Sequence, residues 1–345
     1  MAIVKRRKRS SEVKEVSKEK PTPVETKPFE GYLETVVSTG STLLDLAISG
    51  GVTGEGGVPG GILMEIYGPN STGKTAVLSE LCASAVVRGG DFVFLDPEAR
   101  LDTSYAKIYD VHIDKKNYES PDTVAEVFDY IYNWKPKKKG VNIVVTDSIA
   151  SLSTELELGE KGDKMGMARG KAFSAGLRKT CRMIRKNNWI IACANQVRQG
   201  PAGEYTPGGF GVPFHASLRM RIAFGQSKFI TKEATVGGSA VEETKGIHSI
   251  ITITKSSVDV PFRTADVYII FGHGIDDIRA NLIYCKKYTG ATKFDCFGKE
   301  YVQTDKAISY IEENDLEDRL RQKTIQVWNE VKDKLHVPRK PKVRI

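Results

Sequence analysis

Residues 68–75 read GPNSTGKT, and this segment constrains the fold of the chain more than any other. It fits the pattern G-x-x-x-x-G-K-[ST], follows the apolar run Ile62–Tyr67 and precedes a helical stretch. Glycines let backbone N–H groups turn toward phosphate oxygens, and the N-terminus of the next helix adds the positive end of its dipole. We therefore predict a strand–loop–helix unit, here called the P-loop, in which Lys74 reaches the β- and γ-phosphates and the Thr75 hydroxyl ligates Mg²⁺.

The P-loop predicts ATP and Mg²⁺ as cofactors, and all eight of its residues are expected to surround the phosphates. They are Gly68, Pro69, Asn70, Ser71, Thr72, Gly73, Lys74 and Thr75. A second carboxylate, holding Mg²⁺ through water, is expected at the end of a neighbouring strand. Asp147 fits this place because it ends the apolar run Val141–Asp147 and would emerge at the carboxyl edge of a parallel sheet. An Asp here also fits a simple cap of the following helix.

Hydrolysis of ATP needs a group that positions or activates the attacking water. The run Phe92–Asp96 gives another strand that ends in carboxylates, and Glu98 follows two residues later. Glu98 is our candidate for the catalytic base. Spacing alone does not separate it from Asp96, and either residue also fits an ordinary turn at a strand end.

Apolar, β-branched runs recur along the chain. The predicted buried strands are Ile62–Tyr67, Phe92–Asp96, Val141–Asp147, Trp189–Asn195, Leu218–Phe224, Ser249–Lys255 and Val267–Phe271. Helical stretches around residues 74–89, 121–133 and 166–187 separate the early strands, which is typical of βαβ units. We therefore predict an α/β fold with a mainly parallel central sheet and helices on both faces. The later strands follow one another closely, which predicts an antiparallel edge.

The composition changes along the chain and suggests four parts. We expect a basic disordered segment over residues 1–32, the ATPase core over 33–273, a small α+β C-terminal domain over 274–335 and a basic tail over 336–345. A helix around 316–335 is predicted in the third part. It would place four apolar side chains on one face, namely Leu320, Val327, Val331 and Leu335.

The net charge of +8 is concentrated at the two ends, because residues 1–20 and 332–345 each carry a net +5. Such tails attract nucleic acid at long range, although a solvated disordered tail or a nuclear-type address also fits. No run of 18 apolar residues predicts a membrane span, and no apolar segment follows the basic N-terminal cluster as in a secretory signal. The five scattered cysteines favour a reduced, cytoplasmic setting, and the isolated histidines do not indicate a metal site.

These pieces, in this order, resemble the bacterial RecA recombinases over roughly residues 34–300. The resemblance begins with the segment VSTGS at residues 37–41 and continues through the P-loop into FLDPEARLD at residues 94–102. In the family this last segment carries the catalytic glutamate, so the resemblance assigns that role to Glu98. It also implies that Asp102 contacts the adenine and that Tyr105 stacks on it, although an aromatic there also fits ordinary packing.

The resemblance further implies two DNA-binding loops. Gln196, in the segment NQVR, would sense the γ-phosphate and begin the second loop, in which Arg198 meets a DNA phosphate and the pair Gly208 and Gly209 marks a mobile loop free of secondary structure. The first loop would lie near residues 155–169. Its expected DNA contacts are Arg169, Lys171 and Arg178, although a solvated start of a charged helix fits as well.

Lys255 matches a family lysine that reaches across a filament interface to the γ-phosphate of the neighbouring subunit. The family usually has a second lysine there, and this chain has Ser257 instead. The implied partners are single-stranded DNA, homologous duplex DNA, further copies of the chain in a helical filament, and loader or single-strand-binding proteins. No membrane partner is expected.

The implied function is ATP-dependent, DNA-stimulated homologous pairing and strand exchange. A RecA-fold ATPase of another class, such as a ring helicase or a motor, is the alternative. A DNA-binding filament former that holds ATP without hydrolysing it is a third reading, which Lys74, Thr75, Asp147 and Glu98 argue against.

Overall fold

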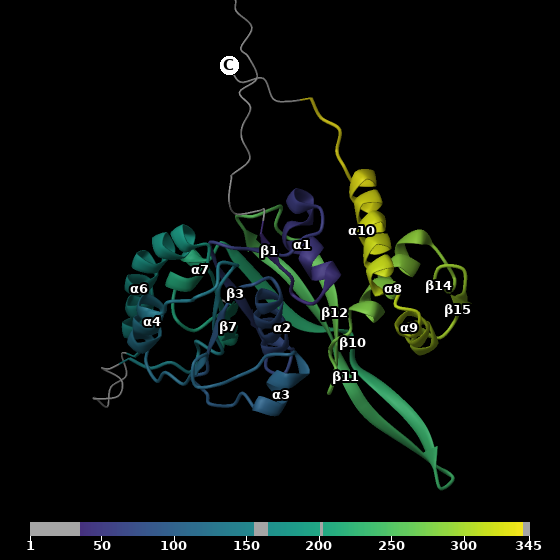
Figure 1. Cartoon of the computed structure of the whole chain (residues 1–345), viewed down its shortest axis with the longest axis horizontal. Coiled ribbons are helices and arrows are strands. Elements are labelled where there is room, and N and C mark those ends of the chain that lie inside the picture. Colours follow the sequence, from purple (N-terminus) through teal and green to yellow (C-terminus); the bar gives the residue numbers. More distant parts are fainter. Residues whose placement is uncertain (1–34, 155–164, 201–202, 341–345) are drawn as a thin grey trace, which may run out of the picture. The chain divides into compact units, whose positions relative to one another are not determined.

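The computed structural model describes residues 35–154, 165–200 and 203–340, and these contain the predicted α/β architecture. A nine-stranded sheet has the order β13-β12-β11-β10-β3-β7-β6-β4-β5 (Figure 1). Its strands, in chain order, are β3 (Ile62–Gly68), β4 (Phe92–Leu95), β5 (Tyr118–Glu119), β6 (Ile143–Thr146), β7 (Ile190–Gln196), β10 (Leu218–Val236), β11 (Ser239–Ser256), β12 (Thr264–Ile270) and β13 (Gly274–Ile275).

The sheet is parallel on one side and antiparallel on the other, as the sequence predicted. Every neighbouring pair from β10 through β3, β7, β6 and β4 to β5 is parallel. The pairs β10–β11, β11–β12 and β12–β13 are antiparallel. The parallel strands need crossover helices, and the closely spaced later strands are joined without one.

Helices cover both faces of this sheet. One face packs against α1 (Thr42–Thr53), α2 (Lys74–Val87) and α3 (Thr103–Ile108), and the other packs against α4 (Val124–Asn133), α6 (Met165–Asn187) and α7 (Gly211–His215). Successive residues of β3 serve the two faces in turn, because Leu63 joins the second cluster while Met64 and Ile66 join the first. Burial on both faces explains why these strands are nearly continuous apolar runs.

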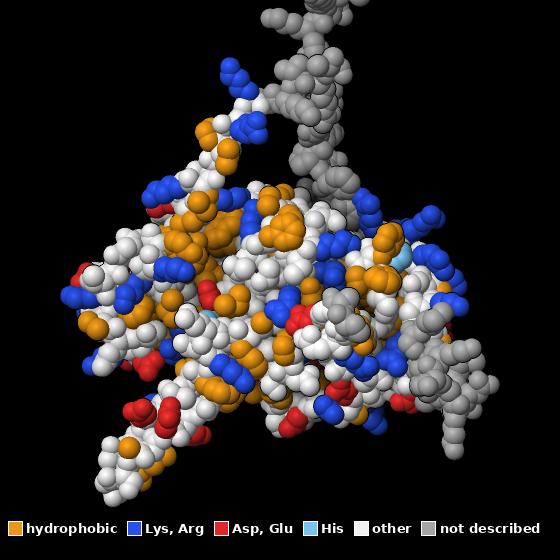
Figure 2. Space-filling model, turned by 180° about the vertical axis from the view of Figure 1, so that it is seen from behind, with side chains coloured by type: hydrophobic (Ala, Val, Ile, Leu, Met, Phe, Trp, Pro, Cys, Tyr) orange, Lys and Arg blue, Asp and Glu red, His pale blue; other side chains and the backbone are white. Residues whose placement is uncertain are grey.

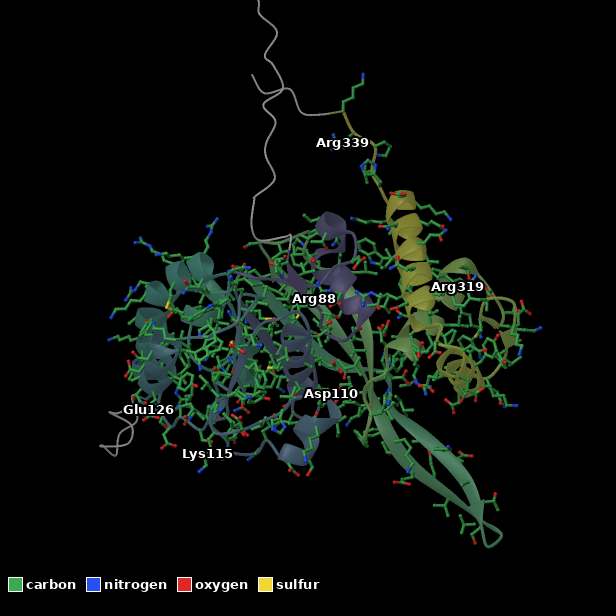
Figure 3. The ribbon with its side chains drawn as sticks, viewed as in Figure 1. Arg88, Asp110, Lys115, Glu126, Arg319 and Arg339 are labelled. Atoms are coloured by element: carbon green, nitrogen blue, oxygen red, sulfur yellow. The ribbon has the colours of Figure 1, made fainter. Side chains whose placement is uncertain are left out.

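Few charged side chains of the described residues are buried, namely Asp45, Glu65, Asp96 and Asp276. Arg88, Glu126 and Arg319, which are labelled in Figure 3, are all exposed. None of the described helices is both long enough and apolar enough to cross a membrane.

The antiparallel pair β10–β11 extends far beyond the sheet, which the sequence analysis did not predict. It predicted Leu218–Phe224 and Ser249–Lys255, whereas the pairing continues to Val236↔Ser239 at the tip. The hairpin projects from the body in both views (Figures 1 and 2). Beyond the pair Ile230↔Gly246 no third strand lies beside this pair among the described residues, since β12 pairs with β11 only as far as Gly246. We call residues 229–246 the projecting hairpin.

The segment after Gln196 was wrongly predicted to be free of secondary structure. β8 (Arg198–Gly200) and β9 (Gly203–Tyr205) form a small antiparallel pair, and α7 follows. The pair is stabilised from outside, because the Arg221 guanidinium donates to both oxygens of Glu204 at 2.9 Å. Gly200 pairs with Gly203, which has a positive φ of 107°.

The C-terminal part has its own apolar cluster, centred on Leu282, Phe294, Ile311 and Leu320. Its elements are α8 (Asp277–Thr289), β14 (Phe294–Asp295), β15 (Glu300–Tyr301), α9 (Thr304–Glu313) and α10 (Glu317–Lys334). The expected apolar face of α10 is confirmed for Leu320 and Val327, which are buried. Leu335 follows the last helical residue and is exposed, so its place on that face was wrong. The division at residues 273/274 stays a prediction.

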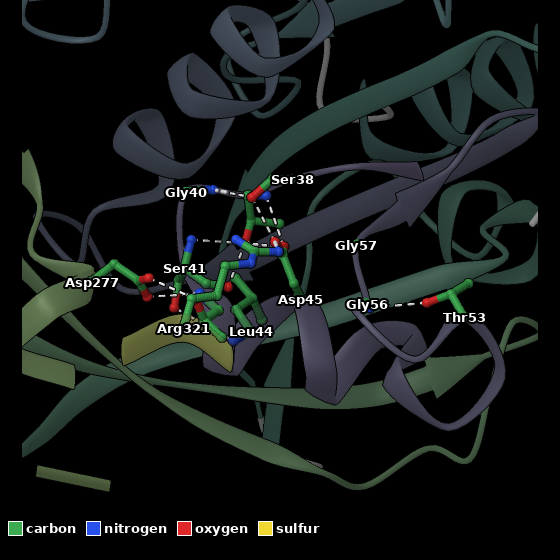
Figure 4. A network of polar contacts seen from close by, with 12 residues as sticks. Ser38, Gly40, Ser41, Leu44, Asp45, Thr53, Gly56, Gly57, Asp277 and Arg321 are labelled. Carbon is green, nitrogen blue, oxygen red and sulfur yellow. Dashed lines mark hydrogen bonds and ion pairs between the residues drawn. The ribbon is translucent and has the colours of Figure 1, made fainter. Parts of the chain in front are cut away.

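The segment VSTGS forms a buried polar turn at the start of α1 (Figure 4). Asp45 is fully buried and accepts hydrogen bonds from the Ser38 hydroxyl at 2.5 Å and from the backbone N–H and hydroxyl of Thr39 at 2.8 and 2.7 Å. Ser41 caps the helix by accepting from the Leu44 N–H. The strand β1 (Val36–Val37) precedes this turn and pairs with β2 (Val58–Pro59), which follows α1.

Candidate nucleotide and nucleic-acid sites

The P-loop joins β3 to α2, as the motif requires. Gly73 caps α2 with a positive φ of 94°, and a Cβ there would lie 2.1 Å from the Ile269 Cδ1 atom, so only glycine fits. The Lys74 ammonium donates to the carbonyls of Gly68 at 3.2 Å and Pro69 at 2.7 Å. Burial lowers the pKa of Lys74, against the opposing effect of Asp147 and Glu98. A partly desolvated cation held by two carbonyls is ready to exchange them for phosphate oxygens.

Asp147 and Thr75 meet at the carboxyl edge of the sheet. The Thr75 hydroxyl donates to the Asp147 Oδ2 atom at 2.5 Å. Burial raises the pKa of Asp147 to about 6, although the Thr75 hydrogen bond and the Lys74 charge both lower it. A hydroxyl and a carboxylate are oxygen ligands of the kind that Mg²⁺ prefers, so these two residues fit the predicted ion.

The structure separates the two carboxylates that spacing left open. Asp96 is 2% exposed and accepts hydrogen bonds from the N–H groups of Arg100 and Leu101 at 2.8 and 2.7 Å. It also accepts from the Tyr118 hydroxyl at 2.9 Å. Asp96 therefore organises the turn after β4 and has few lone pairs left for a water molecule.

Glu98, by contrast, faces the P-loop side of the sheet edge. Its Oε1 atom accepts from the hydroxyls of Ser148 at 3.1 Å and Ser151 at 3.4 Å, and its Oε2 atom pairs with the exposed Arg100 at 2.9 Å. Its charge acts on both Lys74 and Asp147. The arrangement gives a half-exposed carboxylate beside the nucleotide site, which supports Glu98 as the water-activating residue.

A cavity of about 550 Å³ opens beside the P-loop. Ser71, Gly73, Lys74 and Thr75 line one part, and Tyr105 lies on its wall with its hydroxyl 3.0 Å from that of Tyr109. Asp102 is not among the lining residues. It is exposed and caps α3 by accepting from the Ser104 N–H at 2.8 Å. The predicted adenine contact of Asp102 stays a prediction.

Much of this cavity comes from residues that the sequence analysis missed. They belong to the antiparallel side of the sheet and are Phe224, Lys228, Phe229, Ile247, Ile269, Ile270, Phe271, Gly272 and Gly274. Phe271 is 59% exposed at the end of β12, where an aromatic ring is available to a base. The sequence signal for Phe271 was an aromatic residue at a strand end. The pairing of distant strands that brings this residue to the cavity cannot be predicted from local sequence.

A family model described as RecA N-terminal domain matches residues 29–276. A protein RecA from Borrelia duttonii (strain Ly) is 32% identical over 314 residues, covering 89% of this chain and 81% of that protein. One from Rickettsia africae (strain ESF-5) is 36% identical over 246 residues, covering 69% and 67%. One from Rickettsia bellii (strain OSU 85-389) is 32% identical over 314 residues, covering 85% of each. The chain belongs to the RecA family.

In this RecA family member the strand register joins the P-loop to the predicted second DNA loop. Gly68 at the end of β3 pairs with Gln196 at the end of β7. One residue earlier, the Asn195 amide donates to the buried Glu65 at 2.9 Å and to the Pro207 carbonyl at 3.0 Å. Gln196 therefore lies beside the phosphate loop, although it does not line the cavity, and the loop that follows it is tied to the strand that precedes the P-loop.

A second cavity, of about 850 Å³, lies on the side of that loop. It brings together four of the six predicted DNA contacts, since Arg169, Arg198, Gly208 and Gly209 all line it. The glycine pair packs against α6, since a Cβ built at Gly209 would lie 3.3 Å from the Gly170 Cα atom, and both glycines have positive φ. This backbone conformation favours glycine at both positions.

Two further arginines, Arg219 and Arg221, enlarge the basic lining. Arg219 donates to the buried Glu65 at 2.6 Å and lies 4.4 Å above the Tyr67 ring. Neither arginine was among the predicted DNA contacts. The sequence signal for this pair was its spacing. Arg219 and Arg221 are two residues apart in β10, and such residues lie on the same face of a strand.

Lys171 and Arg178 are not brought to this cavity. Both are exposed on α6. The pKa of His215 is lowered chiefly by burial, and the positive charge of Arg178 lowers it further. The predicted first DNA loop, residues 155–169, falls largely outside the described residues, which resume at Met165. The DNA roles of all six predicted residues stay predictions.

Lys255 lies away from the nucleotide cavity of its own chain. Its ammonium donates to the carbonyls of Pro213 at 2.9 Å and Phe214 at 2.8 Å, next to the second DNA loop. Burial lowers its pKa. A lysine held by two carbonyls outside the nucleotide cavity of its own chain fits a cation offered to a neighbouring copy.

Proposed function

We propose that this chain is an ATP-dependent, DNA-stimulated recombinase that assembles on single-stranded DNA and pairs it with homologous duplex DNA. ATP and Mg²⁺ would bind at the P-loop, Thr75 and Asp147. The observation that carries the proposal is the direct link between two sites. The pairing of Gly68 with Gln196 and the contacts of Asn195 connect the phosphate loop to the arginine-lined cavity.

The second cavity suits a nucleic-acid backbone. Arginines offer charge and bidentate geometry to phosphates, and a glycine-rich loop allows close approach of the main chain. Contacts of this kind leave base edges free to pair, as a search for homology requires. We therefore expect affinity for single-stranded DNA to fall steeply with salt and to depend little on sequence.

The chemistry at the nucleotide site follows from the same residues. Mg²⁺, when bound, neutralises charge on the phosphates. Lys74 holds the phosphate chain, and Glu98 orients the attacking water and takes up its proton. In this proposal Lys255 of one subunit completes the site of the next, so hydrolysis depends on assembly. The free cysteines, four of them buried, support a reducing compartment such as the cytoplasm.

The test is ATP hydrolysis by the purified chain with and without single-stranded DNA. We expect strong stimulation by the strand, no hydrolysis by Lys74→Ala, and strand exchange without unwinding of a forked duplex. Hydrolysis that ignores DNA would contradict the proposal. Unwinding of the fork would favour the ring helicase or motor instead.

A further inference from the structure

The base of the projecting hairpin contains a large irregularity beside the nucleotide cavity. Phe224 pairs with Ser249, but the next pair is Phe229 with Ile247. Four residues of β10, 225–228, therefore stand opposite the single residue His248. A bulge of this kind redirects the strand and aims the side chains that it carries. Here it carries Lys228 and Phe229 to the wall of the cavity that Lys74 and Thr75 also line.

The bulge is anchored in the structure. A Cβ at Gly225 would lie 2.3 Å from the His248 Nδ1 atom, so the backbone there rests on the imidazole ring. That ring is 8% exposed, stacks on Tyr268 with centroids 4.4 Å apart and contacts the Asp266 carboxylate at 2.7 Å. A buried and stacked ring fixes the position of the bulge, and through it the position of Lys228.

The same region is tied to the phosphate loop. The hydroxyl of Ser249 donates to the Thr72 carbonyl at 2.8 Å. Ile269 lies against Gly73, and Ile247, the partner of Phe229, lies 3.8 Å from a Cβ built at that glycine. The bulge and the P-loop are therefore neighbours in one packed unit.

The ammonium of Lys228 lies over two aromatic rings. It lies 4.2 Å from the Phe224 ring centroid and 4.7 Å from that of Phe229, and no described carboxylate pairs with it. Ring faces attract a cation only weakly at an exposed site. A cation held by two rings at the wall of a phosphate-binding cavity would gain more from an anionic ligand.

We propose that Lys228 is a second lysine for the phosphate chain of the bound nucleotide, delivered by the β10 bulge, so that nucleotide binding orders the projecting hairpin. This rests on the proposed nucleotide site. A two-stranded ribbon without a third strand is marginally stable by itself. A ligand contact at its base therefore reduces its local opening.

The experiment measures affinity for a slowly hydrolysed ATP analogue in wild type, Lys228→Met, Lys228→Arg and Lys232→Met. Lys232 is the matched control, because it is exposed on the same strand but does not line the cavity. We expect Lys228→Met to bind about tenfold more weakly with a smaller salt dependence, and the other two variants to bind like wild type.

Amide hydrogen exchange over residues 229–246 gives the second readout. The analogue should slow exchange in wild type and Lys232→Met, but much less in Lys228→Met at matched occupancy. Wild-type affinity of Lys228→Met, or an equal loss in Lys232→Met, would overturn the inference while leaving the nucleotide site intact. Failure of wild type itself to bind the analogue would instead overturn the proposed function.

Discussion

At the scale of a single side chain, the proposed role of Asp147 would link Mg²⁺ binding to pH. Its pKa is raised to about 6, chiefly by burial, and Mg²⁺ binds the carboxylate but not the protonated acid. Lowering the pH through 6 therefore protonates the group and weakens metal binding.

We accordingly predict that Mg²⁺-dependent affinity for an ATP analogue is constant from pH 7 to 8 and falls about tenfold per pH unit below about 5.5. Calorimetric titration across pH 5 to 8 measures this, with proton release on binding near pH 6. Asp147→Asn should show weak binding that no longer changes with pH in this range. A flat profile for wild type would show that this carboxyl does not bind the metal in competition with a proton.

Glu98 and Asp96 should behave differently when substituted. Glu98→Gln keeps the shape of the side chain but removes the base, so we expect hydrolysis to fall about 100-fold or more with unchanged thermal stability and nucleotide affinity. Asp96→Ala leaves several buried donors without an acceptor, so we expect a loss of about 2–4 kcal/mol in unfolding free energy. Steady-state kinetics measures the loss of hydrolysis in Glu98→Gln, and thermal melts measure the loss of stability in Asp96→Ala. Near-normal hydrolysis by Glu98→Gln would contradict the proposal that Glu98 activates the attacking water.

At this scale the sequence predicted the P-loop and Asp147 from local context alone. Spacing alone did not separate Glu98 from Asp96, because both follow one strand and their surroundings differ only in the folded chain, and it was the family resemblance that favoured Glu98. The sequence analysis missed Phe224, Lys228 and Phe271, because they reach the cavity through pairings between distant strands.

The start of α1 shows how one element depends on a buried carboxylate. Asp45 accepts three hydrogen bonds from Ser38 and Thr39, and Arg321 of α10 approaches it to 3.9 Å. Burial raises the pKa of Asp45 to about 6, so protons bind more tightly to the folded than to the unfolded chain. Its contribution to stability is therefore largest below about pH 4 and decreases as the pH rises to about 6.

We predict that Asp45→Ala lowers the free energy of unfolding by about 2 kcal/mol at pH 7, because the buried Thr39 N–H loses its acceptor. The loss should be larger at pH 4.5. Denaturant titrations at both pH values test this, with the exposed Asp129→Ala of α4 as control. Equal losses at the two pH values would contradict the raised pKa.

Among the elements, the sequence predicted well those that carry a strong periodic pattern. β3, β4, β6, β7, α2 and α6 agree with prediction to within a few residues. The projecting hairpin was missed because its residues alternate polar and apolar only weakly and bury little. The β8–β9 pair was missed because glycines signal freedom from local constraint, whereas here Arg221 of β10 holds Glu204 of β9 from elsewhere in the fold.

Across the whole molecule, the nucleotide site and the arginine-lined cavity share the β3–β7 pair, and Lys255 lies outside its own nucleotide cavity. Both features are expected if ATP is held between neighbouring subunits and if its hydrolysis changes the affinity for DNA. A lone subunit would then have an incomplete site, so assembly and nucleotide binding should support each other.

Electron microscopy of the chain with single-stranded DNA, Mg²⁺ and a slowly hydrolysed ATP analogue tests this claim most directly. We predict continuous helical filaments that are absent without nucleotide and absent for Lys74→Ala, with Lys255→Ala forming few and short ones. Monomers or closed rings under conditions where nucleotide binding is saturated would contradict the account.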